Sequence, residues 1–140
     1  MNITQQISTF VENRPGAFRE ILQVIQSNGI NIKALSIADT ADFGILRFIV
    51  AKPDDLGKIL REAGFIVKKT PVLALTIGDK PGTLLTYVDK LSDAGINIEY
   101  VYAFTTAIEN VAKVVVKADD VDQAMNLLSN DPEIKEYLQA

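Results

Sequence analysis

The 140-residue sequence contains no cysteine and no histidine. The absence of cysteine excludes a disulfide framework and is compatible with a reducing compartment. The absence of histidine removes the usual zinc ligand, the usual general base and the side chain that titrates near neutral pH. We therefore expect no metal site, no cofactor and no catalytic residue in this chain.

The sequence also lacks a long apolar run and an excess of basic charge. Its apolar runs are far too short to cross a bilayer, and its first residues do not resemble a secretory signal. Eighteen acidic against fourteen basic residues give a net charge of −4, whereas nucleic acids and anionic membranes attract basic surfaces. We expect a cytoplasmic globular protein that binds neither nucleic acid nor membrane.

One tetrapeptide, Gly-Ile-Asn-Ile, occurs at residues 29–32 and again 66 positions later at residues 95–98. At the same offset Pro15-Gly16 aligns with Pro81-Gly82, and ten positions between residues 9 and 54 are identical without a gap. A fixed internal period indicates repeated structural units. The repeat predicts two domains, residues 1–70 and 71–140, with Thr70-Pro71 as a minimal linker.

The apolar pattern repeats together with the identities. Helix-face spacing relates two sets of residues at the same offset: Phe18, Ile21, Leu22 and Ile25, and Leu84, Tyr87, Val88 and Leu91. Strand spacing relates Leu46, Phe48 and Val50 to Ala112, Val114 and Val116. After a one-residue slip, a second helix face relates Leu56, Ile59, Leu60 and Ala63 to Val121, Ala124, Met125 and Leu128. Each copy is therefore predicted to run strand, helix, strand, strand, helix.

The two copies are predicted to end differently. The first copy adds a strand over residues 65–69, which completes a βαββαβ unit of the ferredoxin-like kind. The second copy shows no such strand, and Ile134, Tyr137 and Leu138 have the spacing of a short helix. The predicted fold class is α+β, with two ferredoxin-like units, antiparallel sheets with helices on one face, and a last strand missing from the second unit.

Two segments, ENRPGAFREILQVIQSNGINIKALS and GDKPGTLLTYVDKLSDAGINIEYVY, resemble the opening half of an ACT domain. The match is specific because two Pro-Gly turns are each followed thirteen residues later by Gly-Ile-Asn-Ile. The resemblance implies a free-standing tandem pair of amino-acid-sensing modules, paired side by side through their second strands into one continuous sheet. It also implies that the ligand lies where the turn of one domain meets the second strand of the other.

The residues expected to bind a free amino acid fall into three groups. The helix starts offer unpaired N–H groups to the ligand carboxylate: Gly16, Ala17, Phe18, Gly82, Thr83 and Leu84. The turns offer the polar side chains of Asn13, Arg14, Asp79 and Lys80. The entries of the second strands offer side-chain amides or main-chain groups from Asn31, Ile32, Asn97 and Ile98.

The turn residues also have alternative interpretations. Asp79 would bind the ligand ammonium more strongly than Asn13, because an anionic acceptor makes a charge-assisted hydrogen bond. Both residues could instead cap the turn by accepting from nearby amides. Arg14 and Lys80 either hold an anionic ligand side chain or are ordinary solvated charges, and the asparagines of the strand entries could serve turns.

An aromatic row, Tyr100, Tyr102 and Phe104, occupies alternate positions of the second strand in the second copy. Exposed apolar rows usually mark interfaces, so this row predicts a homodimer. The alternative is that the rings cover an edge of the core within one chain.

The leading hypothesis is a non-catalytic amino-acid sensor that regulates amino-acid metabolism, with an enzyme or a transporter as its partner. One alternative is an assembly or regulatory module that binds no ligand. Another is a small enzyme on the same scaffold, because a fold does not determine a function.

Overall fold

The structure is a computed structural model that describes residues 1–39, 42–104 and 106–134. Over these residues the α+β chain forms six strands and four helices in the order β1 (Asn2–Glu12), α1 (Ala17–Ser27), β2 (Ala34–Asp39), β3 (Phe43–Ile49), α2 (Pro53–Glu62), β4 (Val67–Gly78), α3 (Thr83–Asp93), β5 (Ile98–Phe104), β6 (Val111–Ala118) and α4 (Val121–Ser129). The order strand, helix, strand, strand, helix occurs twice, as the repeated apolar pattern predicts.

The chain forms two compact units. The first unit contains residues 5–70, and the second contains residues 71–140 together with residues 1–4. Met1 and Ile3 pack against the core of the second unit. Strand β1 therefore begins in the second unit and continues in the first, whereas β4 begins in the first unit and continues in the second.

Strand β4 runs without a break through Thr70 and Pro71. The two residues expected as a linker are thus part of a strand, at the boundary between the two units, and the last strand of the first copy begins at Val67 rather than at residue 65. Proline is tolerated in a strand where the ladder does not need its missing N–H, and Pro71 is exposed.

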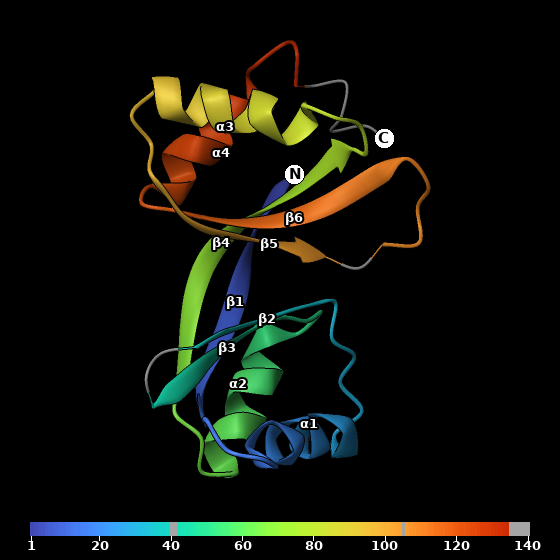
Figure 1. Cartoon of the computed structure of the whole chain (residues 1–140), viewed down its shortest axis with the longest axis vertical. Helices are drawn as coiled ribbons and strands as arrows, with labels where there is room; N and C mark the ends of the chain where they lie inside the picture. The colour runs from blue at the N-terminus through green and yellow to red at the C-terminus, as the bar shows by residue number, and fades with distance from the viewer. Residues whose placement is uncertain (40–41, 105, 135–140) are drawn as a thin grey trace. The chain divides into compact units, whose positions relative to one another are not determined.

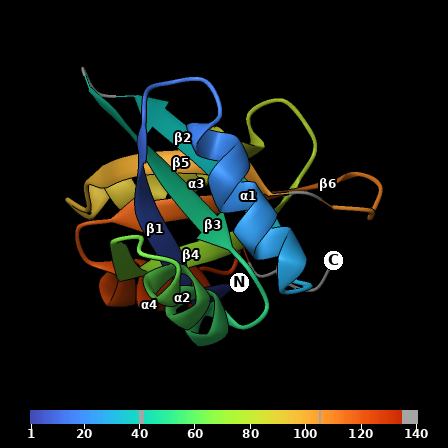
Figure 2. The ribbon, with the colours of Figure 1, turned by 90° about the horizontal axis from the view of Figure 1, so that it is seen from below.

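The first unit has the strand order β1, β3, β2, with both neighbours antiparallel to β3. Helices α1 and α2 contact each other and lie on the same face of these strands, as Figures 1 and 2 show from two directions. The core between them contains Ile21 and Ile25 from α1, Leu56 and Leu60 from α2, and Phe48 from β3. These buried positions explain the helical and alternating spacing in the sequence.

The second unit repeats this arrangement with the order β4, β6, β5. Helices α3 and α4 contact each other and lie on one face of these strands (Figure 1). Its core contains Tyr87 and Leu91 from α3, Val116 from β6, and Ala124 and Leu128 from α4.

The register of β6 corrects the alignment of the repeat. In the first unit Ile7 lies opposite Phe48. The residue 66 positions after Ile7 is Leu73, which lies opposite Val116 in the second unit. Phe48 therefore corresponds to Val116 at an offset of 68, since 116 − 48 = 68, and the expected equivalence with Val114 is wrong. The connection between the second and third strands is two residues longer in the second copy.

The same offset applies to the second helix of each unit. Leu56 and Leu60 of α2 correspond to Ala124 and Leu128 of α4, and all four side chains are fully buried. The one-residue slip expected from the sequence, which pairs Leu56 with Val121, is wrong. That alignment matched apolar residues and did not allow for the two residues inserted before β6.

The described residues that follow α4, 130–134, form a turn and contain no strand. Lys90 of α3 binds this turn, with its Nζ atom 2.8 Å from Asp131 Oδ2 and 3.1 Å from Glu133 Oε2. Ile134 is buried in the core. The short helix expected around Ile134, Tyr137 and Leu138 falls largely on residues 135–140, which lie outside the described residues.

Candidate functional site

The two Pro-Gly turns have the same backbone conformation. Gly16 precedes α1 with φ of 89°, and Gly82 precedes α3 with φ of 84°. This left-handed conformation is unfavourable for residues that carry a Cβ atom. Glycine therefore allows the chain to turn sharply from a strand into a helix in each unit.

Both helices begin without a side-chain cap. Glu20 N–H donates to the Gly16 carbonyl at 3.0 Å, and Thr86 N–H donates to the Gly82 carbonyl at 3.2 Å. The first of these N–H groups are occupied, because Ala17 and Thr83 donate to the Arg14 and Lys80 carbonyls at 3.3 Å. The N–H groups of the next two residues, 18–19 and 84–85, precede the first helical hydrogen bond, so they have no acceptor within the helix. Ala17, Phe18, Thr83 and Leu84 lie in this first turn, where the helix carries partial positive charge.

The position of each turn is fixed by the neighbouring strand connection. Asn13 N–H donates to the Asp42 carbonyl at 3.4 Å, and Asp79 N–H donates to the Asn110 carbonyl at 2.9 Å. The side chains of Asn13 and Asp79 are exposed, and within residues 1–39, 42–104 and 106–134 neither accepts a hydrogen bond from an amide of its turn. By contrast, helix α4 begins with a side-chain cap, in which Asp120 accepts a hydrogen bond from Gln123 N–H at 2.9 Å.

The basic residues of the two turns have different surroundings. Arg14 Nε lies 2.8 Å from Glu12 Oε2, and Arg14 Nη2 lies 3.2 Å from Glu20 Oε2. These hydrogen bonds, first to Glu12 and then to Glu20, raise the pKa of Arg14. In the second turn Lys80 is exposed, and its carbonyl accepts from the Thr83 hydroxyl at 3.0 Å.

A pocket of about 160 Å³ borders the first turn. Asn13, Arg14 and Phe18 line it, together with Ile37 and Asp39 from β2. The structure thus brings three of the expected site residues together beside the end of β2. Sequence analysis did not identify Ile37 and Asp39. Their place beside the first turn depends on the pairing of β2 and β1 with the same strand, β3, and the sequence pattern does not show this pairing.

Asn31 and Ile32 lie elsewhere in the first unit. They border a separate hollow of about 470 Å³ that also includes Gln26 and Gly29 at the end of α1. Since α1 has 11 residues, the two ends of the helix are roughly 16 Å apart. Within this unit the structure does not bring the strand entry to the glycine turn.

The corresponding strand entry of the second unit is held by a different contact. Asn97 N–H donates to Asp119 Oδ1 at 3.1 Å, and its carbonyl accepts from Asp119 N–H at 3.0 Å. The main-chain groups of Asn97 are therefore occupied, whereas its side chain is exposed. Ile98 is half-buried and packs against the core.

The aromatic row of β5 lies on the sheet face opposite the core of the second unit. Val101 and Ala103 pair with residues of the core, whereas Tyr100, Tyr102 and Phe104 point to the other face and are half-buried. The rings of Tyr100 and Tyr102 stack with centroids 6.3 Å apart. A register shift next to Ile98 allows it to face the core although it has the same spacing as the aromatic row.

None of the helices formed by the described residues is long and apolar enough to span a bilayer. In the same part of the chain, no group of three or more acidic side chains is placed to hold a metal ion.

Comparisons with known proteins agree with this architecture. A family model described as an ACT domain pair matches residues 1–135. The crystal structure of protein BT0572 from Bacteroides thetaiotaomicron is 38% identical, with a TM-score of 0.85 and coverage of 91% of this chain and 87% of that chain. No match is found among curated proteins.

Regulatory subunits of aspartate kinase share the fold at lower identity. The ligand-free subunit from Thermus thermophilus is 16% identical with a TM-score of 0.65, covering 92% of this chain and 96% of that one. The subunit from Thermus flavus is 16% identical with a TM-score of 0.63, covering 91% and 94%. Since the family model spans nearly the whole sequence and the repeat supplies both Pro-Gly turns, the chain belongs to the family of ACT domain pairs.

Proposed function

We propose that this ACT pair is a non-catalytic sensor that binds a free amino acid and regulates a protein of amino-acid metabolism. The observation that supports the proposal most directly is the pair of uncapped helix starts behind left-handed glycines. Such a start offers N–H donors and partial positive charge to a carboxylate. The absence of a glycine side chain lets a ligand approach this backbone closely.

The ligand ammonium is assigned to the turn residue two positions before the proline, Asn13 or Asp79. Both side chains are exposed, and Asp79 carries a charge that strengthens the bond to an ammonium. The site of the second turn should therefore bind more tightly. The proposal places the ligand between this turn and the second strand of an adjacent ACT unit, where the side chains of Asn31 or Asn97 lie.

Regulation requires that the ligand bind two arrangements of the protein with different affinity. The proposed arrangement is a homodimer in which ACT units lie side by side, with the row of Tyr100, Tyr102 and Phe104 contributing to the interface. The partner would be an enzyme or a transporter. The fold shared with aspartate kinase regulatory subunits is consistent with such a role.

The test is a thermal-shift screen of the twenty amino acids, followed by calorimetry. A true ligand at about 100 times its Kd should stabilise the protein by about 2.7 kcal/mol, and it should be recovered chemically unchanged. Sedimentation at micromolar concentration with and without the ligand measures the expected dimer. A 15.3 kDa species alone would contradict the dimer.

Matched variants locate the site. Asp79→Ala should weaken binding by at least about tenfold through loss of a charge-assisted hydrogen bond, and the neutral turn variant Asn13→Ala should have a smaller effect. If no amino acid binds, the proposed sensor function is wrong. If one binds and Asp79→Ala binds it equally well, only the assignment of the ammonium is wrong.

A further inference from the structure

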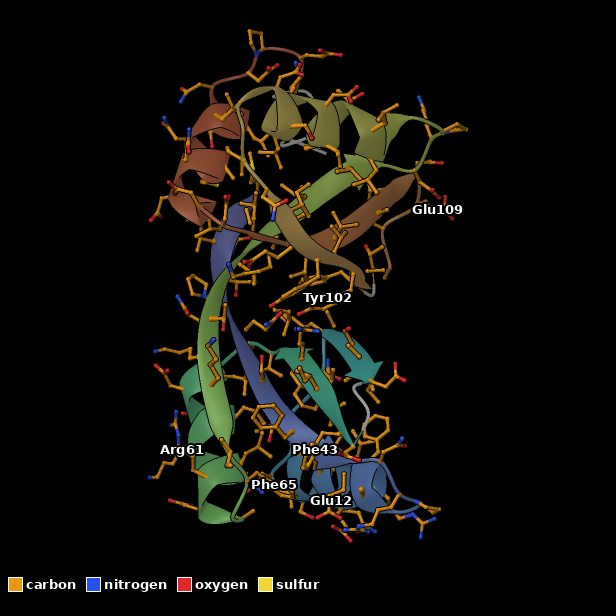
Figure 3. All side chains as sticks on the ribbon, turned by 60° about the vertical axis from the view of Figure 1, so that its left-hand side comes forward. Glu12, Phe43, Arg61, Phe65, Tyr102 and Glu109 are labelled. Carbon is orange, nitrogen blue, oxygen red and sulfur yellow. The ribbon has the colours of Figure 1, made fainter. Side chains whose placement is uncertain are left out.

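A second cleft in the first unit has a different composition. It has a volume of about 280 Å³ and lies among the end of β1, the start of α1 and the loop before β4. We call it the phenylalanine cleft, because Phe10, Phe43 and Phe65 line it together with Ile66. Figure 3 shows Phe43 and Phe65 in the same part of the unit, close to Glu12.

The apolar wall of the phenylalanine cleft is unusually exposed. The exposed fractions are 52% for Phe10, 49% for Phe43 and 71% for Ile66. Large apolar side chains that gather at the surface commonly mark a binding site. A concave site lined by apolar groups with a few polar groups at its edge has the composition of a small-molecule pocket.

The second unit builds the same fold without this composition. The positions that correspond to Phe10, Glu12 and Glu20 at an offset of 66, and to Phe43 at the offset of 68, hold Thr76, Gly78, Thr86 and Val111. The aromatic rings and the carboxylates are therefore not required by the fold. Their presence in only one unit indicates a separate role.

The charged rim of the cleft favours a cation. Arg14 lies between the carboxylates of Glu12 and Glu20, at 2.8 and 3.2 Å. Two carboxylates and one guanidinium leave a net charge of −1, and the side chains of Glu12 and Glu20 are 66% and 56% exposed. An approaching cation is attracted to this rim, and an approaching anion is repelled.

We propose that the phenylalanine cleft binds a primary amine that carries one positive charge and an aromatic or branched aliphatic body. The body packs against Phe10, Phe43 and Ile66, and the ammonium lies beside Glu12 and Glu20. Faces of the phenylalanine rings also attract cations. The cleft shares Arg14 and Ala17 with the expected amino-acid site of the first turn, and it does not depend on the tighter site proposed at the second turn.

Calorimetry with three probes of one shape and different charge tests the proposal. Phenethylamine is a cation, phenylalanine is a zwitterion and 3-phenylpropionate is an anion. Phenethylamine should bind saturably, and 3-phenylpropionate should bind at least about tenfold more weakly because the rim repels it. Absence of saturable phenethylamine binding, or equal affinity for the amine and the acid, would overturn the proposal.

Variants at exposed positions connect the binding to the cleft. Phe10→Ala and Ile66→Ser should each weaken phenethylamine binding about tenfold by removing apolar contact. The matched control is Ile108→Ser in the second unit, where the side chain is 53% exposed, and it should leave binding unchanged. Circular dichroism checks that each variant is folded.

One result would assign a different occupant to the cleft. If Phe10→Ala leaves phenethylamine binding unchanged and lowers self-association in sedimentation, the cleft is an interface between copies of the chain. The amine proposal is then wrong.

Discussion

The turn before α1 and the turn before α3 have nearly the same backbone and different electrostatic surroundings. Gly16 and Gly82 differ by only 5° in φ, 89° against 84°. In the first turn, however, Arg14 forms ion pairs with two carboxylates, those of Glu12 and Glu20. In the second turn the positions of those carboxylates hold Gly78 and Thr86.

This difference shows which features the fold requires. The strand-to-helix turn needs a glycine and the main-chain contact to the adjacent strand connection, and both units have them. The side chains around the turn point to solvent, so their charges differ without a change in backbone. A ligand site is therefore able to differ between two units of the same fold.

The largest effect on the free energy of unfolding is expected from substitutions at corresponding positions of the two cores. Phe48→Ala should lower the free energy of unfolding by about 3–5 kcal/mol, because it leaves a large cavity at a fully buried position. Val116→Ala, at the corresponding position, should cost about 2 kcal/mol because it removes fewer buried groups. Chemical denaturation followed by circular dichroism measures both values.

Tyrosine fluorescence distinguishes the two units in this experiment. All four tyrosines, Tyr87, Tyr100, Tyr102 and Tyr137, occur after residue 70, and the chain has no tryptophan. For Phe48→Ala we expect the circular dichroism transition to move further than the fluorescence transition, since each unit has its own core. Equal shifts of both signals would show that the units unfold together.

Much of the fold could be predicted from the sequence because burial imposes a period on each element. The order of strands and helices and the buried faces of α1 and α3 follow from this period. The two residues inserted before β6 could not be predicted, because a solvent-exposed connection has no required pattern. The continuity of β4 through Pro71 was also missed, since proline commonly ends a strand.

Only part of the candidate site could be predicted in the same way. The repeated Pro-Gly pair identified the two helix starts, because this backbone needs particular residue types. Ile37 and Asp39 were missed, since their place beside the first turn depends on strand pairing. The enclosure of Arg14 by Glu12 and Glu20 depends on side-chain conformation, which one sequence does not specify.

Substitution of the turn glycines, with a smaller expected effect on stability, tests whether the turn backbone is equivalent in the two units. Gly16→Ala and Gly82→Ala should each destabilise their unit by about 1–2 kcal/mol, because alanine is strained at positive φ. An added Cβ meets no atom within 4 Å at either position, so the expected cost is conformational. Thermal and chemical unfolding measure it.

Gly57→Ala in α2 is the matched control for these two variants. A Cβ at this position meets its nearest atom, in the Arg61 side chain, at 3.5 Å, which is ordinary contact. Glycine within a helix is less stable than alanine by about 0.5–1 kcal/mol, so this variant should stabilise the protein. If all three substitutions have the same sign, the left-handed turn is not the cause.

The smallest expected effect concerns the ends of the two units. In the second unit Lys90 forms an ion pair with Asp131 in the turn after α4. The aligned position in the first unit is Val24, a half-buried apolar residue. The hydrogen bond from Lys90 is the main cause that lowers the pKa of Asp131. The contribution of this carboxylate to stability is therefore present above its ordinary pKa of about 3.9 and is lost as pH falls through the lowered value.

Carbon-13 NMR titration of the Asp131 carboxyl tests this difference. In Lys90→Met the pKa of Asp131 should rise towards its ordinary value, and the loss of stability on acidification should become smaller, because folding no longer favours the ionised form. The control is Lys58→Met, which removes an exposed lysine 3.9 Å from Glu62 and leaves Lys90 in place. An Asp131 pKa that is the same in the parent and in Lys90→Met would show that the ion pair does not fasten this turn in solution, and the two units would then end without this electrostatic difference.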